Sequence, residues 1–261
     1  MDRSLFTRID ASIISLVLLV LMLATVVVGH KSRKWFWGPE DGDTRGGIKA
    51  LLGALFGLWG FMLAFTFSQS GNRLENVRAM IVDEANLLRT AIIKADLFPD
   101  SVRNIYRAEL HKYLEERISY YDDAADFVKA DINRQEISKT AVALWTITAD
   151  QSKKTSMNGP VNSMIESLTA LFDIGIRREA LLSAGIPNPI TLILIILALA
   201  ICFVGGFTTP VINRKEWIVV TVFAILASTI LFITIDLARP MRGLIRADAG
   251  EVALTRLRDF F

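Results

Sequence analysis

The feature that most constrains this chain is a set of four long apolar segments. Each is 18 to 21 residues long, and a helix of roughly 17 to 25 residues is long enough to cross the hydrocarbon layer of a membrane. Lys49 and Asp236, the only ionisable residues within them, lie one or two residues from a segment end. We therefore predict four transmembrane helices without a charge at mid-membrane, at residues 11–29, 48–67, 190–207 and 217–237.

The composition supports a membrane protein and excludes several other classes. Hydrophobic residues make up 52% of the 261 residues, the mean hydropathy is +0.41 and the net charge is only +2. A single cysteine, Cys202, and two histidines cannot form a disulfide framework or a Cys/His zinc cluster. Phosphate-binding, dinucleotide-binding and hydrolase motifs are absent from the sequence. We expect no enzymatic activity, no metal and no cofactor.

Between the second and third apolar segments lies a polar insert, residues 72–185. Its apolar residues recur at intervals of three and four, which is typical of helices, and no alternation typical of strands is visible. From Asn72 to Asp96 the sequence has no Pro or Gly, and its apolar stripe includes Leu74, Val77, Ile81, Ala85 and Leu88. The second apolar segment and this stripe should therefore form one long helix to about residue 94. Further helices are expected after Pro99, over residues 137–148 and from residue 161. The apolar stripe of the last one is Val161, Ile165, Leu168, Phe172 and Ile176.

These patterns predict an all-α protein with a helical insert. We divide it into a first transmembrane hairpin, the helical domain, a second hairpin and an amphipathic basic tail. An even number of spans places both termini and the insert on one side. Twelve arginines near the membrane on that side, against seven basic residues on the other, favour a cytoplasmic insert. The four regions comprise residues 1–71, 72–185, 186–237 and 238–261.

The second apolar segment carries small residues along one helical face. Gly53, Gly57, Gly60 and Ala64 recur every three or four residues, and Ser68 and Gly71 extend the series. A stripe of this kind permits close approach of another helix, with Gly53, Gly57 and Ala64 as the packing positions. Alternatively, in a ring of subunits, this helix could line a pore with a hydrophobic neck and a polar exit. The pore-lining candidates are Phe56, Gly60, Leu63, Phe67, Ser68 and Ser70.

Charged residues beyond the membrane suggest three further features. Glu75 and Arg78 are spaced for an ion pair along the helix. In a ring of subunits, charges on this helix would surround a vestibule and influence which ions enter. Asp236, at the end of the fourth segment, has Arg239 as its nearest candidate partner. The arginine-rich tail after Pro240 should lie on the membrane surface or on the insert. The vestibule candidates are Arg73, Arg78 and Glu84.

Two sequence motifs resemble those of a known family. The first comprises Ala64-Phe65-Thr66-Phe67-Ser68, Asn72-Arg73-Leu74-Glu75-Asn76-Val77-Arg78, Val82-Asp83-Glu84-Ala85-Asn86 and Ala95-Asp96-Leu97-Phe98-Pro99; the second is Asp236-Leu237-Ala238-Arg239-Pro240-Met241-Arg242-Gly243-Leu244-Ile245. Both are similar to motifs of the bestrophin-like domain-of-unknown-function family of bacterial membrane proteins. The family is distantly similar to bestrophins, which are oligomeric ion channels whose second transmembrane helix lines the pore.

The resemblance implies a homo-oligomeric channel of the bacterial inner membrane that conducts small ions passively, preferentially anions, through a pore lined by the second segment. Phe56, Leu63 and Phe67 would form its constriction. No acidic cluster resembling the calcium clasp of eukaryotic bestrophins is recognisable in the sequence. We expect lipid, small inorganic ions and further copies of the chain as partners, and no nucleic acid. The alternative is a membrane-anchored interaction module whose insert binds a soluble partner; a lipid-modifying enzyme is a third hypothesis.

Overall fold

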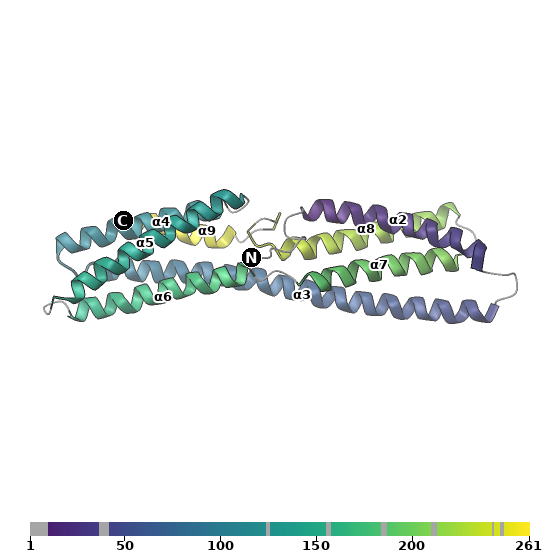
Figure 1. Ribbon diagram of the computed structural model, residues 1–261, viewed down its shortest axis with the longest axis horizontal. Coiled ribbons are helices and arrows are strands. Elements are labelled where there is room, and N and C mark those ends of the chain that lie inside the picture. Colours follow the sequence, from purple (N-terminus) through teal and green to yellow (C-terminus); the bar gives the residue numbers. More distant parts are fainter. Residues whose placement is uncertain are drawn as a thin grey trace. The chain divides into compact units, whose positions relative to one another are not determined.

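The computed structural model describes residues 10–36, 42–123, 126–154, 158–183, 187–209, 213–241, 243–245 and 248–261. These residues form α-helices, a short 3-10 helix and connecting turns, and they contain no strand. The helices are α2 (Ala11–Phe36), α3 (Gly42–Ala95), α4 (Asp100–Asp122), α5 (Phe127–Ser152), α6 (Asn158–Ser183), α7 (Asn188–Thr208), α8 (Arg214–Leu237), α9 (Asp248–Thr255) and the 3-10 helix η2 (Arg256–Phe260) (Figure 1). The predicted all-α fold is confirmed.

The chain divides into two compact units. The first, here called the membrane unit, comprises Met1–Asn72 and Gly185–Arg239; the second, here called the insert unit, comprises Arg73–Ala184 and Pro240–Phe261. All four predicted segments lie in helices long and apolar enough to cross a membrane. As predicted, α3 is one continuous helix, and its 54 residues span about 80 Å at the usual rise per residue.

Helices α2, α7 and α8 form the centre of the membrane unit, where α2 packs against both of the others. Glycine brings α2 and α7 together: a Cβ built on Gly206 would lie 2.2 Å from the carbonyl oxygen of Val26, and one on Gly29 would lie 2.2 Å from that of Phe203. Ser15 Oγ donates to the carbonyl of Ser228 at 2.9 Å and so joins α2 to α8. Close backbone approach therefore stabilises this core, as expected where lipid supplies little hydrophobic driving force.

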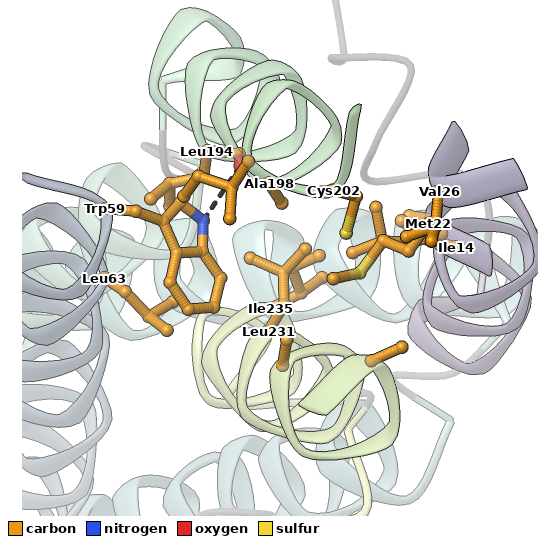
Figure 2. Packing of buried hydrophobic residues seen from close by; sticks show 14 of the residues in the cluster. Ile14, Met22, Val26, Trp59, Leu63, Leu194, Ala198, Cys202, Leu231 and Ile235 are labelled. Carbon is orange, nitrogen blue, oxygen red and sulfur yellow. Dashed lines mark hydrogen bonds between the residues drawn. The ribbon is translucent and has the colours of Figure 1, made fainter. Parts of the chain in front are cut away.

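Helix α3 joins this core through only one of its faces. Figure 2 shows Trp59 and Leu63 pointing from α3 toward α7 and α8, with Ile14, Met22 and Val26 of α2 on the opposite side of the core. Trp59 Nε1 donates to the carbonyl of Leu194 at 3.0 Å. In an apolar stretch of 18 residues taken from each of the four helices, 17% of the α3 stretch is buried, against 28% to 33% of the other three. Helix α3 is thus the least covered of the four.

In the insert unit, the second half of α3 contacts α4 and α6, and α5 packs with α4 and α6. Its apolar residues are buried along the predicted stripe, including Leu74, Val77, Ile81 and Leu88. Helix α5 is longer than the predicted residues 137–148, because Asp126 caps its start by accepting from the backbone N–H groups of Val128 and Lys129. Only the middle of α5 is marked by clustered apolar residues, which explains the short prediction.

The buried face of α6 differs from the predicted one. We expected Val161, Ile165, Leu168, Phe172 and Ile176 to face the core, but Ile176 is 68% exposed. Val161 and Leu168 are buried as predicted. The other buried positions include Met164, Leu171, Gly175 and Arg178. Arg178 lies at the end of the buried face. Because a charged residue does not count as part of an apolar stripe, the predicted stripe was placed one residue too far along the helix.

Candidate functional site

The membrane portion of α3 has one buried face and a wide uncovered arc. Trp59, Leu63, Thr66 and Ser70 are buried, and their spacing of three and four places them on a single helical face. Thr66 and Ser70 satisfy their hydroxyls within the helix, donating to the carbonyls of Met62 at 2.7 Å and Thr66 at 2.9 Å. This face is fully used in holding α3 against the rest of the membrane unit.

The small residues lie outside that face. A Cβ built on Gly53, Gly57 or Gly60 would have no atom of the described residues within 4 Å beyond its own helix, and Ala64 is exposed. The predicted packing role of Gly53, Gly57 and Ala64 therefore has no partner among the residues that the structure describes. A role in packing against another chain stays a prediction.

The six pore-lining candidates divide into two groups. Phe56, Gly60, Phe67 and Ser68 are exposed, and at about 100° per residue they share the arc that carries the small residues. The Phe56 ring, 38% exposed, also packs edge-on against Phe223 of α8 at 5.1 Å. Gly60, Phe67 and Ser68 therefore lie on one uncovered arc of the helix, and Phe56 lies at its edge.

The other two candidates, Leu63 and Ser70, are corrections. Leu63 belongs to the hydrophobic core and Ser70 is 1% exposed. Addition of further subunits can only reduce the exposure of a side chain, so neither residue can line a pore in this conformation. A spacing of three or four residues fits several faces of one helix. The contact between Trp59 of α3 and Phe223 of α8 shows which face is covered.

The three predicted vestibule charges have different surroundings. Arg73 reaches α6, where its Nη2 donates to the carbonyls of Leu181 at 2.6 Å and Leu182 at 3.2 Å. Arg78 Nη1 lies 2.8 Å from Glu75 Oε1, which confirms the predicted ion pair. Glu84 is only 1% exposed. Its vestibule role is therefore wrong, because the carboxylate lies inside the insert unit.

Glu84 is the centre of a buried cluster that connects three helices. Its Oε1 lies 2.8 Å from Arg117 Nε of α4 and accepts from the Tyr113 hydroxyl at 3.4 Å. Its Oε2 accepts from Arg178 Nη1 of α6 and, at 3.4 Å, from the Tyr121 hydroxyl. Each carboxylate oxygen thus receives one guanidinium and one phenol. We call these five residues the Glu84 cluster.

The protonation states in the cluster follow from burial and charge. Burial raises the pKa of Tyr113 to about 12, with Arg117 opposing the shift, and burial likewise raises the pKa of Tyr121. Burial alone would lower the pKa of Arg117, but Glu84 together with Tyr113 and Tyr121 more than reverses this, and the net change is upward. Both phenols are therefore neutral and Arg117 is charged. Gly175 makes room for the Arg117 side chain, since a Cβ on residue 175 would lie 2.6 Å from Arg117 Nη2.

Sequence reasoning did not find this cluster, although a signal was present. Glu84 lies three residues after Ile81 and four before Leu88, so it occupies the buried face of α3. Arg117 and Arg178 likewise continue the apolar stripes of α4 and α6. A charged residue in phase with an apolar stripe predicts a buried ionic contact, because burial of an unpaired charge is costly.

The predicted pair of Asp236 and Arg239 lies at the end of α8. Asp236 is 4% exposed. Burial lowers the pKa of Arg239, and the nearby carboxylates of Asp10 and Asp236 raise it. The backbone N–H of Arg239 also donates to the carbonyl of Asp236 at 2.9 Å. Asp236 thus has a positive charge nearby, and the structural role proposed for the pair stays a prediction.

The described residues contain no group of three or more His, Cys, Asp or Glu side chains that could hold a metal ion. The structure instead has two candidate features: an uncovered small-residue arc on α3 in the membrane unit, and the buried Glu84 cluster in the insert unit. The described residues thus belong to a helical protein with four candidate membrane spans.

Known structures have the same fold. A crystal structure of a bacterial bestrophin homologue from Klebsiella pneumoniae matches with a TM-score of 0.65 and 15% identity, covering 94% of this chain and 97% of that chain. A variant of the same homologue matches with a TM-score of 0.65 and 13% identity, covering 94% and 98%. No functionally curated protein matches significantly. At these identities the likeness shows the fold.

Residues 14–249 match the model of the family described as the bestrophin-like domain. The match covers most of the chain, so the protein belongs to the bestrophin-like family. This confirms the resemblance inferred from the two sequence motifs.

Proposed function

We propose that the protein is a homo-oligomeric, bestrophin-like channel that conducts small ions passively, with α3 lining the pore. One observation carries the proposal. In the membrane unit, α3 is held by a single face, while Gly60, Phe67 and Ser68 lie on an exposed arc, and Phe56, at the edge of this arc, packs partly against Phe223. An arc of small residues, aromatic rings and a hydroxyl supplies a narrow apolar neck and a polar exit.

A passive channel fits the four membrane helices better than a coupled transporter. Coupling to protons or sodium ions generally uses ionisable groups near the bilayer midplane. Asp236 is the penultimate residue of α8, and no other acid lies within predicted segments 11–29, 48–67, 190–207 and 217–237. Conduction through a hydrophobic neck needs no such group.

The preference for anions is proposed from the family resemblance. The corrected vestibule is consistent with it, because Glu84, the acid among its three predicted charges, is buried while Arg73 and Arg78 stay partly exposed. Reversal potentials in a potassium chloride gradient test this point separately. A reversal near the potassium equilibrium potential would overturn the anion preference and leave the channel intact.

Recording from purified protein in planar bilayers tests the channel itself. We expect wild-type currents, and larger unitary conductance in Phe56→Ala and Phe67→Ala, because both changes widen the proposed neck. Phe65→Ala is the matched control, since Phe65 is 57% exposed on a different side of α3. Silent membranes for every variant, or equal conductance in all four proteins, would contradict the proposal and favour the membrane-anchored interaction module.

A particle image of the purified assembly tests the geometry. We expect several copies around one axis with α3 innermost. A single subunit, or a ring whose centre is occupied by another helix, would contradict the pore assignment even if currents were recorded.

A further inference from the structure

The Glu84 cluster contains more positive than negative charge. Arg117 and Arg178 are 6% and 0% exposed, and Glu84 is the carboxylate that lies between them. Both of its oxygens already accept one guanidinium and one phenol, so it has little capacity for a further donor. Arg134, which pairs with Glu179 at 2.8 Å and with Asp131 at 3.3 Å, is not part of the cluster. The five residues of the cluster therefore carry one net positive charge.

Arg178 also has an unused hydrogen-bonding edge. Its Nη1 donates to Glu84 and Tyr121, but its Nε and Nη2 have no hydrogen-bond partner among the residues that the structure describes. Because the side chain is completely buried within one chain, a neighbouring subunit cannot reach this edge. A buried donor pair of this kind requires an explanation such as a bound ion or water.

The same edge binds anions elsewhere in this protein. Arg258 uses Nε and Nη2 to hold both carboxylate oxygens of Glu115, at 2.7 and 2.6 Å. Arg107 uses the same two atoms to hold Asp96, at 3.1 Å each. These are the parallel bonds by which a guanidinium recognises a carboxylate. The free edge of Arg178 presents the same donors in the interior of the insert unit.

The surroundings of Arg178 are aromatic. Its guanidinium carbon lies 5.8 Å from the centroid of the Tyr120 ring and 5.3 Å from that of Tyr121. The rings weakly stabilise the cation but do not cancel its charge. A water molecule could accept from the two N–H groups, yet it would leave the excess charge in place, which is costly in a buried site.

Arg178 is buried, its Nε and Nη2 atoms have no partner among the described residues, and the cluster has a net positive charge. From these three observations we infer that the Glu84 cluster binds one small monovalent anion at Nε and Nη2 of Arg178. One negative charge makes the cluster neutral, and a small ion is required because the edge is enclosed. The site is in the insert unit and does not depend on the proposed channel function, so it would stabilise the fold of the protein even if no current flowed.

Thermal unfolding of the full-length chain in detergent tests the site. The melting midpoint should rise with the concentration of sodium chloride or bromide relative to sodium gluconate at equal sodium, since gluconate is too large to enter. Binding to the folded state alone produces this dependence. Arg177→Gln is the matched control, because Arg177 is the exposed neighbour of Arg178, and it should keep the wild-type dependence.

Two variants should change the anion dependence in opposite directions. Arg178→Gln removes the excess charge and the donor edge, so the midpoint should become equal in bromide and gluconate. Glu84→Gln raises the excess charge to two, so the dependence should become steeper than in the wild type. Both lower stability, and a purely structural cluster would therefore give no difference between them in the response to anions.

A direct measurement remains decisive if either variant fails to fold. Wild-type crystals grown in sodium bromide should give an anomalous difference peak in contact with Nε and Nη2 of Arg178. Equal melting in all three salts together with no such peak would overturn the proposal and leave water as the partner of this edge.

Discussion

At the scale of single residues, the glycines of the membrane unit fall into two groups. Gly29 and Gly206 lie where α2 and α7 almost touch, and each faces a backbone carbonyl of the other helix. Gly53, Gly57 and Gly60 have no described atom close enough to meet a Cβ. The sequence shows both groups as glycines in apolar helices, and only the packing separates them.

This difference predicts contrasting effects of alanine at adjacent positions. Gly206→Ala should lower the melting midpoint by several degrees, because the new Cβ would lie 2.2 Å from a backbone oxygen that cannot rotate away. Gly205→Ala should leave it unchanged or raise it slightly, since nothing lies within 4 Å and alanine favours a helix by about 1 kcal/mol over glycine. Circular dichroism of both variants in detergent measures the difference, and equal midpoints would contradict the close contact.

Glu84 permits a second comparison between two glutamates of one helix. Glu84→Gln should destabilise the insert unit by roughly 3 to 5 kcal/mol, because it leaves buried guanidinium groups without their counter-charge. Glu75→Gln should cost about 0.5 kcal/mol or less, since the Glu75 side chain is 70% exposed. Chemical denaturation of both variants tests this, and similar losses would show that Glu84 is not buried as described.

At the scale of elements, the C-terminal segment packs against α4. Leu254 and Leu257 are buried, Arg258 binds Glu115 of α4, and the Phe261 ring meets His111 edge-on at 4.8 Å. The sequence left open whether this tail lies on the membrane or on the insert. The structure favours the insert, because both the apolar residues and the charges of the tail find partners there.

The Arg258 contact should make stability depend on pH. Hydrogen bonding from Arg258 lowers the pKa of Glu115 below its ordinary value of 4.5, so the stabilisation is present above that value and is lost as the pH falls through the lowered pKa. Arg258→Ala should therefore lower stability slightly at neutral pH, as is usual for an exposed pair, and should have no effect in strong acid. Denaturation of both proteins across this range measures it; a constant difference would contradict the ion pair.

Helix periodicity predicted some elements well and others poorly. The long helix α3 was predicted because no Pro or Gly interrupts residues 72–95 and its apolar stripe is regular. The face of α6 was misplaced because Arg178 occupies a buried position. Periodicity predicts the buried face of a helix from its apolar residues alone. A charged residue can also lie on that face when other helices supply its partners, and periodicity does not show this.

At the scale of the whole molecule, the insert and both termini should lie on the cytoplasmic side. Ser138→Cys in α5 and Lys215→Cys at the start of α8 are both exposed positions expected on opposite sides. A membrane-impermeant maleimide should label Lys215→Cys in intact spheroplasts and Ser138→Cys only after lysis. The natural Cys202 is buried and should contribute little background. The reverse pattern would invert the proposed topology.

The sequence by itself determined the membrane-spanning character, the helical class, the continuity of α3 and the family. These follow from the length and apolarity of each segment and from local motifs, which do not depend on distant residues. Only the tertiary structure decided that Leu63 and Ser70 face inward, that Gly29 and Gly206 bring helices together, and that Glu84 lies between two arginines. Each of these depends on residues far apart in the chain, so no local pattern could specify the partner.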